Sequence, residues 1–95
     1  MERKYEAIFV FKINDNFKNL IKQVNKIFEN YNMKIIRKDD LGEKKLAYTI
    51  KGYNEGHYYY LDLVDENNRD DVEGKISMEL NTIEDLIKHI IIKKD

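Results

Sequence analysis

The sequence contains no cysteine and no apolar run long enough to cross a membrane. The missing cysteines exclude disulfide frameworks, thiolate zinc sites and cysteine nucleophiles. Only four glycines are present, and none belongs to a phosphate-cradling loop. The start, MERKYEAIFVF, passes almost directly into a strand pattern and shows no signal peptide. We therefore expect an intact cytoplasmic protein without a membrane partner.

The residues that could support chemistry are scattered along the chain. His57 and His89 stand apart without a nearby set of ligands, so neither predicts a metal site. No carboxylate pair has a supporting base or nucleophile, and we assign the acidic side chains, Asp65 included, to loops and the surface. The sequence therefore predicts no enzyme, no catalytic residue, no cofactor and no small-molecule substrate.

The overall charge excludes few kinds of partner. Lys and Arg together number 17, Asp and Glu number 18, and the formal net charge is -1. Local basic patches decide nucleic-acid binding more than the total does, so RNA stays possible. A chain of 95 residues is long enough for one domain with a single modest core. We expect one domain over residues 1–95.

The first third of the chain predicts a strand followed by a helix. Lys4–Lys12 alternates with a period of two, and we assign its odd-numbered face, which is apolar or aromatic, to the core. Asn14 and Asp15 are candidate N-caps for the helix. Apolar residues then recur at three- and four-residue spacing from Phe17 to Tyr31, which indicates an amphipathic helix. Asn30–Asn32 can end it, because asparagine tolerates the left-handed conformation.

The rest of the chain predicts three more strands and a second, short helix. The connection between the second and third strands is expected at Lys51–Gly56, and a polar loop follows the third strand. In the second helix, Val72 and Ile76 are expected to be buried, with Met78 and Leu80 as further candidates. In chain order, the expected bounds are Met33 to about Lys51, His57–Val64, about Arg69–Leu80 for the helix, and Leu86–Lys93.

The order strand, helix, strand, strand, helix, strand predicts an α+β fold of the ferredoxin-like βαββαβ split type. Right-handed crossovers place both strand-helix-strand units on one four-stranded antiparallel sheet. Both helices then cover one face, and the other face stays open. The first strand lies in the middle, between the third and the fourth.

The most aromatic stretch is Leu41–Leu63, and it carries cations between its tyrosines. Gly42 inside a strand pattern marks a bulge or bend. Tyr58 and Tyr60 share one face of the third strand and Tyr59 the other, so at least one set is assigned to the core or to a partner. Aromatic and cationic side chains on one sheet indicate RNA or a protein partner.

Four segments resemble the bacterial-type small-subunit ribosomal protein six family over essentially the whole chain. The most specific is the run of Leu41 and Gly42, two basic residues, and then Leu46–Tyr48. The chain departs from the family at Thr49, where proline is usual, and so retains a backbone donor that proline lacks. The segments are KYEAIFVF at Lys4–Phe11, LGEKKLAYTI at Leu41–Ile50, EGHYYYLDL at Glu55–Leu63 and MELNTIEDLIKHIIIKK at Met78–Lys94.

This resemblance implies a structural component of the small ribosomal subunit. It implies pairing with ribosomal protein eighteen and binding of the pair to a junction in the central domain of the small-subunit ribosomal RNA, during assembly of the platform. Basic residues can neutralise phosphates, and an exposed tyrosine can stack on a base. With the resemblance, the expected RNA-binding residues are Arg3, Lys4, Tyr5, Lys45, Tyr48, Lys88 and Lys93.

One alternative is a ligand-sensing or acylphosphatase-like domain of the same fold. Such an enzyme needs an arginine in a phosphate-cradling loop after the first strand. This chain has Ile13, Asn14 and Asp15 there, which favours the hypothesis of a ribosomal protein.

Overall fold

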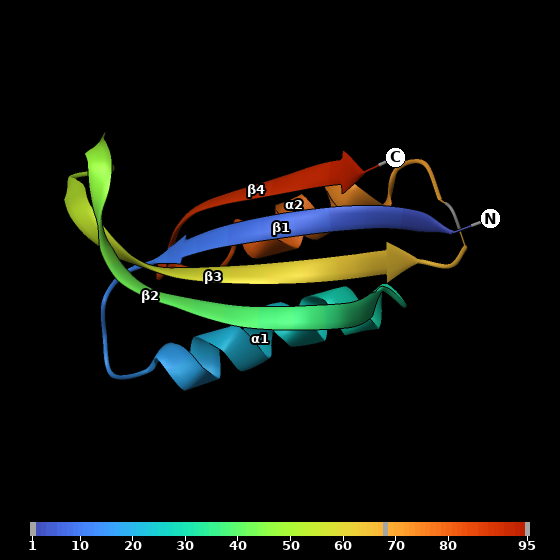
Figure 1. Ribbon diagram of the computed structural model, residues 1–95, viewed down its shortest axis with the longest axis horizontal. Helices are drawn as coiled ribbons and strands as arrows, with labels where there is room; N and C mark the ends of the chain where they lie inside the picture. The colour runs from blue at the N-terminus through green and yellow to red at the C-terminus, as the bar shows by residue number, and fades with distance from the viewer. Residues whose placement is uncertain (1, 68, 95) are drawn as a thin grey trace.

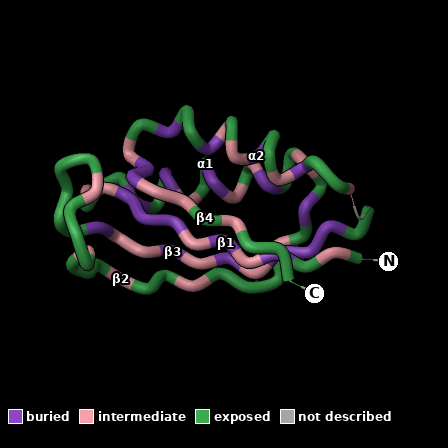
Figure 2. Tube along the Cα trace, turned by 90° about the horizontal axis from the view of Figure 1, so that it is seen from above, coloured by how far each residue is buried: buried purple, intermediate pink, exposed green. Residues whose placement is uncertain are grey.

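The computed structural model describes residues 2–67 and 69–94 of the chain. Four strands form one antiparallel sheet in the order β2-β3-β1-β4. Both helices lie on the same side of it (Figures 1 and 2), which confirms the expected ferredoxin-like split fold. The elements are β1 (Arg3–Phe11), α1 (Phe17–Asn30), β2 (Lys34–Ile50), β3 (Tyr53–Asp65), α2 (Val72–Leu80) and β4 (Leu86–Lys94).

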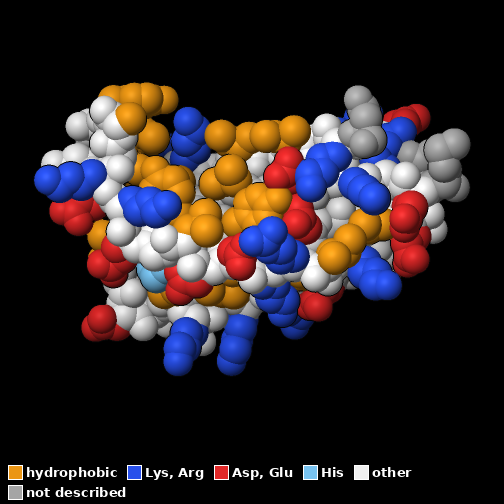
Figure 3. Space-filling model, viewed as in Figure 1, with side chains coloured by type: hydrophobic (Ala, Val, Ile, Leu, Met, Phe, Trp, Pro, Cys, Tyr) orange, Lys and Arg blue, Asp and Glu red, His pale blue; other side chains and the backbone are white. Residues whose placement is uncertain are grey.

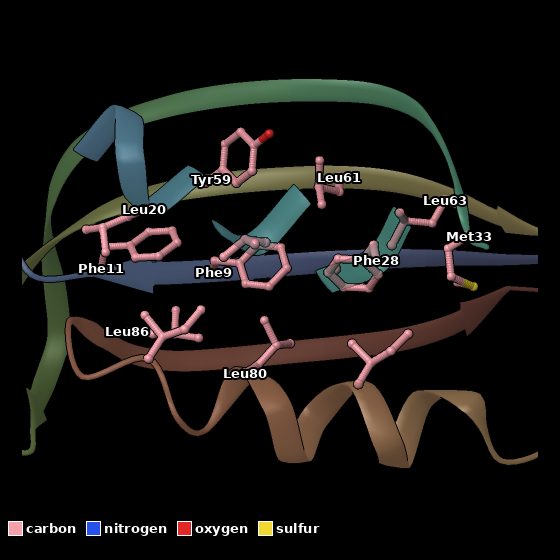
Figure 4. Close-up of a cluster of buried hydrophobic side chains, with 14 of the residues drawn as sticks. Phe9, Phe11, Leu20, Phe28, Met33, Tyr59, Leu61, Leu63, Leu80 and Leu86 are labelled. Carbon is pink, nitrogen blue, oxygen red and sulfur yellow. The ribbon is translucent and has the colours of Figure 1, made fainter. Parts of the chain in front are cut away.

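The core lies between the sheet and the helices, and β1 runs through its middle. The odd-numbered residues of β1 face the helices, and Ala7, Phe9 and Phe11 are completely buried, as the alternation predicts. Phe9 meets Phe28 of α1 edge-on, with 6.0 Å between the ring centroids, a geometry that aromatic pairs prefer. Figure 4 shows these rings beside Leu61 and Leu63 of β3.

The helices bury the residues that share one helical face. Val72, Ile76 and Leu80 follow each other at four-residue spacing, and all three are buried. Met78 is 73% exposed, so its assignment as a core candidate is wrong. Two residues along a helix correspond to about 200° of rotation, which turns Met78 away from the side that Ile76 buries.

The start of α1 differs from the expected caps, and its end agrees with the prediction. The residue before the helix is Asn16, and not Asn14 or Asp15. The Asn14 side chain instead accepts the backbone N–H of Asn16 at 2.8 Å, which forms an Asx turn that leads into the helix. After the helix, Asn32 has a φ of 61°, the left-handed conformation expected of an asparagine there.

Strand β2 is long and bends at Gly42. The register with β3 shifts between Asp40 and Gly42, and Gly42 has a φ of 85°, which glycine adopts without strain. Asp40 Oδ1 accepts the Gly42 N–H at 2.9 Å and lies 2.6 Å from His57 Nε2. The His57 ring stacks on Phe17, 3.4 Å away between centroids. These contacts hold the bulge against α1.

The turn between β2 and β3 is shorter than the expected Lys51–Gly56 connection. Lys51 and Gly52 both have positive φ, 52° and 85°, the pattern of a two-residue hairpin turn whose twist matches that of the strands. Tyr53 pairs with Ile50 directly after the turn. The third strand therefore begins four residues before His57.

Asp65 is not a surface charge but a fully buried carboxylate, because the loop after β3 folds back on it. Asp65 accepts the backbone N–H groups of Asn67 and Arg69 at 3.1 and 2.9 Å, and Arg69 donates to it through its side chain as well. The Arg69 guanidinium also donates to the Tyr31 carbonyl. This cluster, which we call the Asp65 clamp, joins the end of β3 to the end of α1.

Candidate nucleic-acid and protein interface

The face of the sheet away from the helices is here called the open face. Cross-strand partners in an antiparallel sheet point to the same side, so the register places residues of neighbouring strands in transverse rows. The even-numbered residues of β1 mark these rows. The open face thereby changes in character from one end of the sheet to the other (Figure 3).

The row at the end where β1 begins is basic. Lys34 of β2 and Lys4 of β1 both pair with Val64 of β3, and Lys4 pairs with Lys94 of β4. All three lysines are exposed. We call Lys34, Lys4 and Lys94 the basic row. Adjacent strands lie about 4.8 Å apart, so the row holds three ammonium groups across the width of the sheet.

The next row is acidic at its centre. Glu6 and Asp62 face each other across β1 and β3, and the Tyr60 hydroxyl lies 2.6 Å from a carboxylate oxygen of each. The hydroxyl has one hydrogen, so it donates to one carboxylate at a time. The Tyr60 hydrogen bond, followed by Lys94 at 3.2 Å, lowers the pKa of Asp62. Both carboxylates form ion pairs with Lys94 of the basic row, at 3.2 Å from Asp62 and 4.0 Å from Glu6. Carboxylates repel phosphate, so this acidic row is a boundary between the basic row and the rest of the open face.

Beyond this boundary the open face is apolar and hollowed. A cavity of about 250 Å³ lies where the far end of the β2–β3 hairpin curves over the sheet (Figure 1). Ile8, Val10 and Ile90 line it on the sheet side, and Tyr48 and Leu46 line it on the hairpin side. Tyr48 is 66% exposed, and Lys88 borders the cavity. We call this cavity the hollow; its lining suits an apolar segment of a partner protein.

The expected RNA-binding residues fall at two separate places. Lys4 belongs to the basic row, and Lys93 stands near it on edge strand β4, exposed on the helix side. Tyr48 and Lys88 lie at the hollow, and exposed Lys45 lies on the same hairpin, farther from its turn than Tyr48 and opposite Glu55.

Two of the expected RNA-binding residues are engaged elsewhere. The Tyr5 side chain is 1% exposed in the core, so it cannot stack on a base, and the expectation for Tyr5 is corrected. Its place on the odd-numbered face of β1 already required burial. The Arg3 guanidinium donates to the Arg69 carbonyl at 2.8 Å and to Asp70 at 3.2 Å, which leaves it partly occupied.

Sequence reasoning missed Lys34 and Lys94 in this interface. Each stands at a strand end, and only the register shows that both flank Lys4. Their lysine side chains alone carried no signal, since exposed lysines also occur on α1, in loops and on the hairpin.

A βαββαβ sheet with two helices on one side and a zoned open face defines a ferredoxin-like binding domain. The family model of ribosomal protein S6 matches residues 4–93. The small ribosomal subunit protein bS6 of Phytoplasma mali is 31% identical over 98% of this chain and 99% of its own length. The bS6 protein of Rickettsia canadensis is 35% identical over 96% of this chain and 75% of its own length.

A solved structure agrees with this family match. The crystal structure of 30S ribosomal protein S6 from Thermotoga maritima superposes with a TM-score of 0.86 at 26% identity, over 99% of this chain and 89% of that one. The chain belongs to the ribosomal protein S6 family. Members of this family are structural proteins of the small ribosomal subunit, a cytoplasmic particle. Within residues 2–67 and 69–94, no helix has the length and apolar character needed to span a membrane.

Proposed function

We propose that this chain binds the central domain of the small-subunit ribosomal RNA together with ribosomal protein eighteen, as a non-catalytic protein of platform assembly. The observation that supports the proposal most is the zoning of the open face. Its basic row suits phosphates and its hollow suits an apolar protein segment, with Glu6 and Asp62 between them. The basic row thus suits the RNA and the floor of the hollow suits the protein, and Tyr48 and Lys88 at the hollow lie where the two partners would meet.

For the RNA, we assign the contacts to the lysines at both ends of the sheet. Lys4 and Lys93 serve the basic end, with Arg3 beside them. Lys45 and Lys88 serve the hairpin end, where exposed Tyr48 can stack on a base. Each lysine that neutralises a phosphate steepens the salt dependence of binding.

For ribosomal protein eighteen, we assign the hollow. Its floor of Ile8, Val10 and Ile90 is apolar, and Ile90 and neighbouring Ile92 are 42% and 48% exposed. Contiguous apolar patches on the surface of folded domains often serve as interaction sites. Filling the hollow with a partner segment removes this surface from water.

A filter-binding assay tests the proposal. The probe is the central-domain junction RNA, and the chain is mixed with ribosomal protein eighteen at moderate salt. We expect binding, and we expect Lys4→Gln with Lys93→Gln to reduce the magnitude of the salt slope by about 2, since each duplex phosphate contact contributes ~0.9. Lys75→Gln is the control, because Lys75 lies on α2 and pairs with Asp71, the residue before that helix. Absence of RNA affinity for the wild-type pair would refute the proposal.

The hollow has its own test. Ile90→Asp places a charge among apolar side chains at a site that is 42% exposed in the free chain, so folding should tolerate it. Binding of ribosomal protein eighteen without RNA should be lost. Retention of that binding would remove the hollow as the docking site.

The acylphosphatase-like alternative also predicts a measurable activity. The loop between β1 and α1 offers Ile13, Asn14 and Asp15 but no arginine, and the Asn14 amide is engaged with Asp85 at 3.4 Å. We expect no turnover of acyl phosphates, and measurable turnover would revive that alternative.

A further inference from the structure

The outer face of α1 carries Lys18, Lys22 and Lys26 at successive four-residue spacings. All three are exposed, and we call them the lysine stripe. Four residues advance a helix by about 6 Å, so the stripe sets positive charges at a regular interval. Figure 3 shows Lys and Arg side chains projecting from the edge of the molecule where Figure 1 draws α1.

The lysine stripe does not stabilise helix α1. Like charges four residues apart on a helix repel each other, and Lys22 has such a neighbour on either side. Lys18 also stands in the first turn, where the helix dipole disfavours a cation, and that turn contains no acidic residue. Among the ion pairs between described residues, none includes a lysine of the stripe.

Helix α2 shows the opposite arrangement on the same face of the molecule. Its only lysine, Lys75, lies 4.0 Å from Asp71, four residues before it. An acidic residue, Glu73, stands in its first turn, which the helix dipole favours. The charges in the first half of α2 therefore support their helix, whereas the lysine stripe of α1 does not, and the stability of α1 gives no reason for the stripe.

The stripe leads toward the basic row. Helix α1 ends beside the start of β2 (Figure 1), and Lys34, the first residue of β2, is also the β2 member of the basic row. Only residues 31–33 separate α1 from β2. The two groups of lysines thus follow one another around the edge of the molecule, from the helix side to the open face.

We infer that the lysine stripe is a second contact for the phosphate backbone of the ribosomal RNA, an inference that rests on the proposed function. The interval between the lysines is close to that between successive phosphates along one strand. The exposed residues between them, Asn19 and Gln23, are polar, whereas the centre of a protein interface is enriched in aromatic and apolar residues. RNA thus contacts the chain along its edge as well as at the basic row.

The test compares the wild type with a triple variant, Lys18→Gln, Lys22→Gln and Lys26→Gln, each with ribosomal protein eighteen and the central-domain junction RNA. We expect the salt slope to fall in magnitude by about 2 to 3, and affinity at about 0.2 M salt to fall roughly fourfold for each lysine that contacts a duplex phosphate. The thermal midpoint should stay constant or rise, because the repulsion disappears. Lys75→Gln is the matched control, since it also removes one exposed helical lysine.

Lys22→Glu separates binding from folding more strongly. It creates attractive pairs with Lys18 and Lys26, so the chain should become more stable while RNA affinity falls below that of Lys22→Gln. An unchanged salt slope in the triple variant would overturn the inference and leave the proposed function standing. Loss of ribosomal protein eighteen binding without RNA would make the stripe a protein contact and overturn it as well. A wild-type pair without RNA affinity would overturn the proposed function first, and the inference with it.

Discussion

Replacing Asp65 by asparagine should be the most destabilising conservative change at a charged residue of this chain. The carboxylate is fully buried. Its Oδ1 atom accepts hydrogen bonds from the backbone N–H of Asn67 at 3.1 Å and from the guanidinium of Arg69 at 3.2 Å. Its Oδ2 atom accepts one from the backbone N–H of Arg69 at 2.9 Å. Asparagine keeps the shape of the side chain, but it offers one acceptor oxygen and turns its amide donors toward the guanidinium.

The cost follows from leaving half of a buried ion pair without its partner. Such a change costs about 3–5 kcal/mol, out of a total folding stability of roughly 5–15 kcal/mol for a domain. Arg69 is partly exposed and can reach water, so the lower end of that range applies. Urea denaturation followed by circular dichroism measures the difference in the free energy of unfolding. A loss below about 1 kcal/mol, the value of an exposed pair, would refute the reasoning.

The matched control is Asp70→Asn. Asp70 also accepts from an arginine, Arg3, at 3.2 Å, but its side chain is 94% exposed, so the substitution should cost less than about 1 kcal/mol of folding stability.

The pH dependence of folding stability adds a second check. Burial opposes ionisation of Asp65, but Arg69 and the backbone donors outweigh it and lower its pKa. The carboxylate therefore stabilises the fold above the ordinary pKa of an aspartate, and this stability is lost as the pH falls through the lowered value. In the Asp65→Asn variant, the free energy of unfolding should depend less on pH in this acidic range.

Three further results are expected. Tyr48→Ala together with Lys93→Ala should weaken assembly with RNA and ribosomal protein eighteen while the thermal midpoint changes little, because both side chains are exposed; an equal loss of both would mean that they belong to the core. Burial, with a smaller contribution from Lys51, lowers the pKa of His89, so the unfolded chain takes up the proton first and stability should fall as the pH drops below about 6.5. His89→Gln should remove that slope in urea unfolding measured across this range, and an unchanged slope would assign it to another group. Gly56→Ala places a methyl group against Val10 and should cost about 1–3 kcal/mol by overpacking, measured by thermal denaturation; a neutral effect would show that Val10 moves aside freely.

The fold could be predicted because the local patterns agreed with one another. From Tyr5 to Phe11 the odd-numbered face of β1 was apolar or aromatic throughout, and Gly42 marked the bulge in β2. The patterns failed where a distant partner decided the outcome. Asp65 resembled a loop charge, since nothing local shows that Arg69 and the end of α1 enclose it. Tyr53 and its neighbours resembled a loop, since pairing with β2 is not encoded in their own composition.

The interface could be predicted only in part. The basic residues at the strand ends were identifiable, but the basic row depends on a register that joins Lys34, Lys4 and Lys94. Tyr5 received two incompatible assignments, core and RNA contact, and the alternation of β1 decides for the core. The hollow depends on how far the hairpin curves over the sheet, which no local pattern specifies.

The position of β1 also determines when this chain can fold during its own synthesis. The first strand made lies in the middle of the sheet, and one of its two neighbours, β4, is the last strand made. Until β4 has left the exit tunnel, Ile8 and Val10 lack a neighbouring strand on that side. The backbone edge of β1 is then unpaired and can pair with strands of other chains. Translation at about 5–20 residues per second is slow compared with hairpin formation. Strands β2 and β3 can therefore pair before β1 has both of its neighbours. A pause at any point after β1 has emerged and before β4 has done so would therefore prolong an aggregation-prone state.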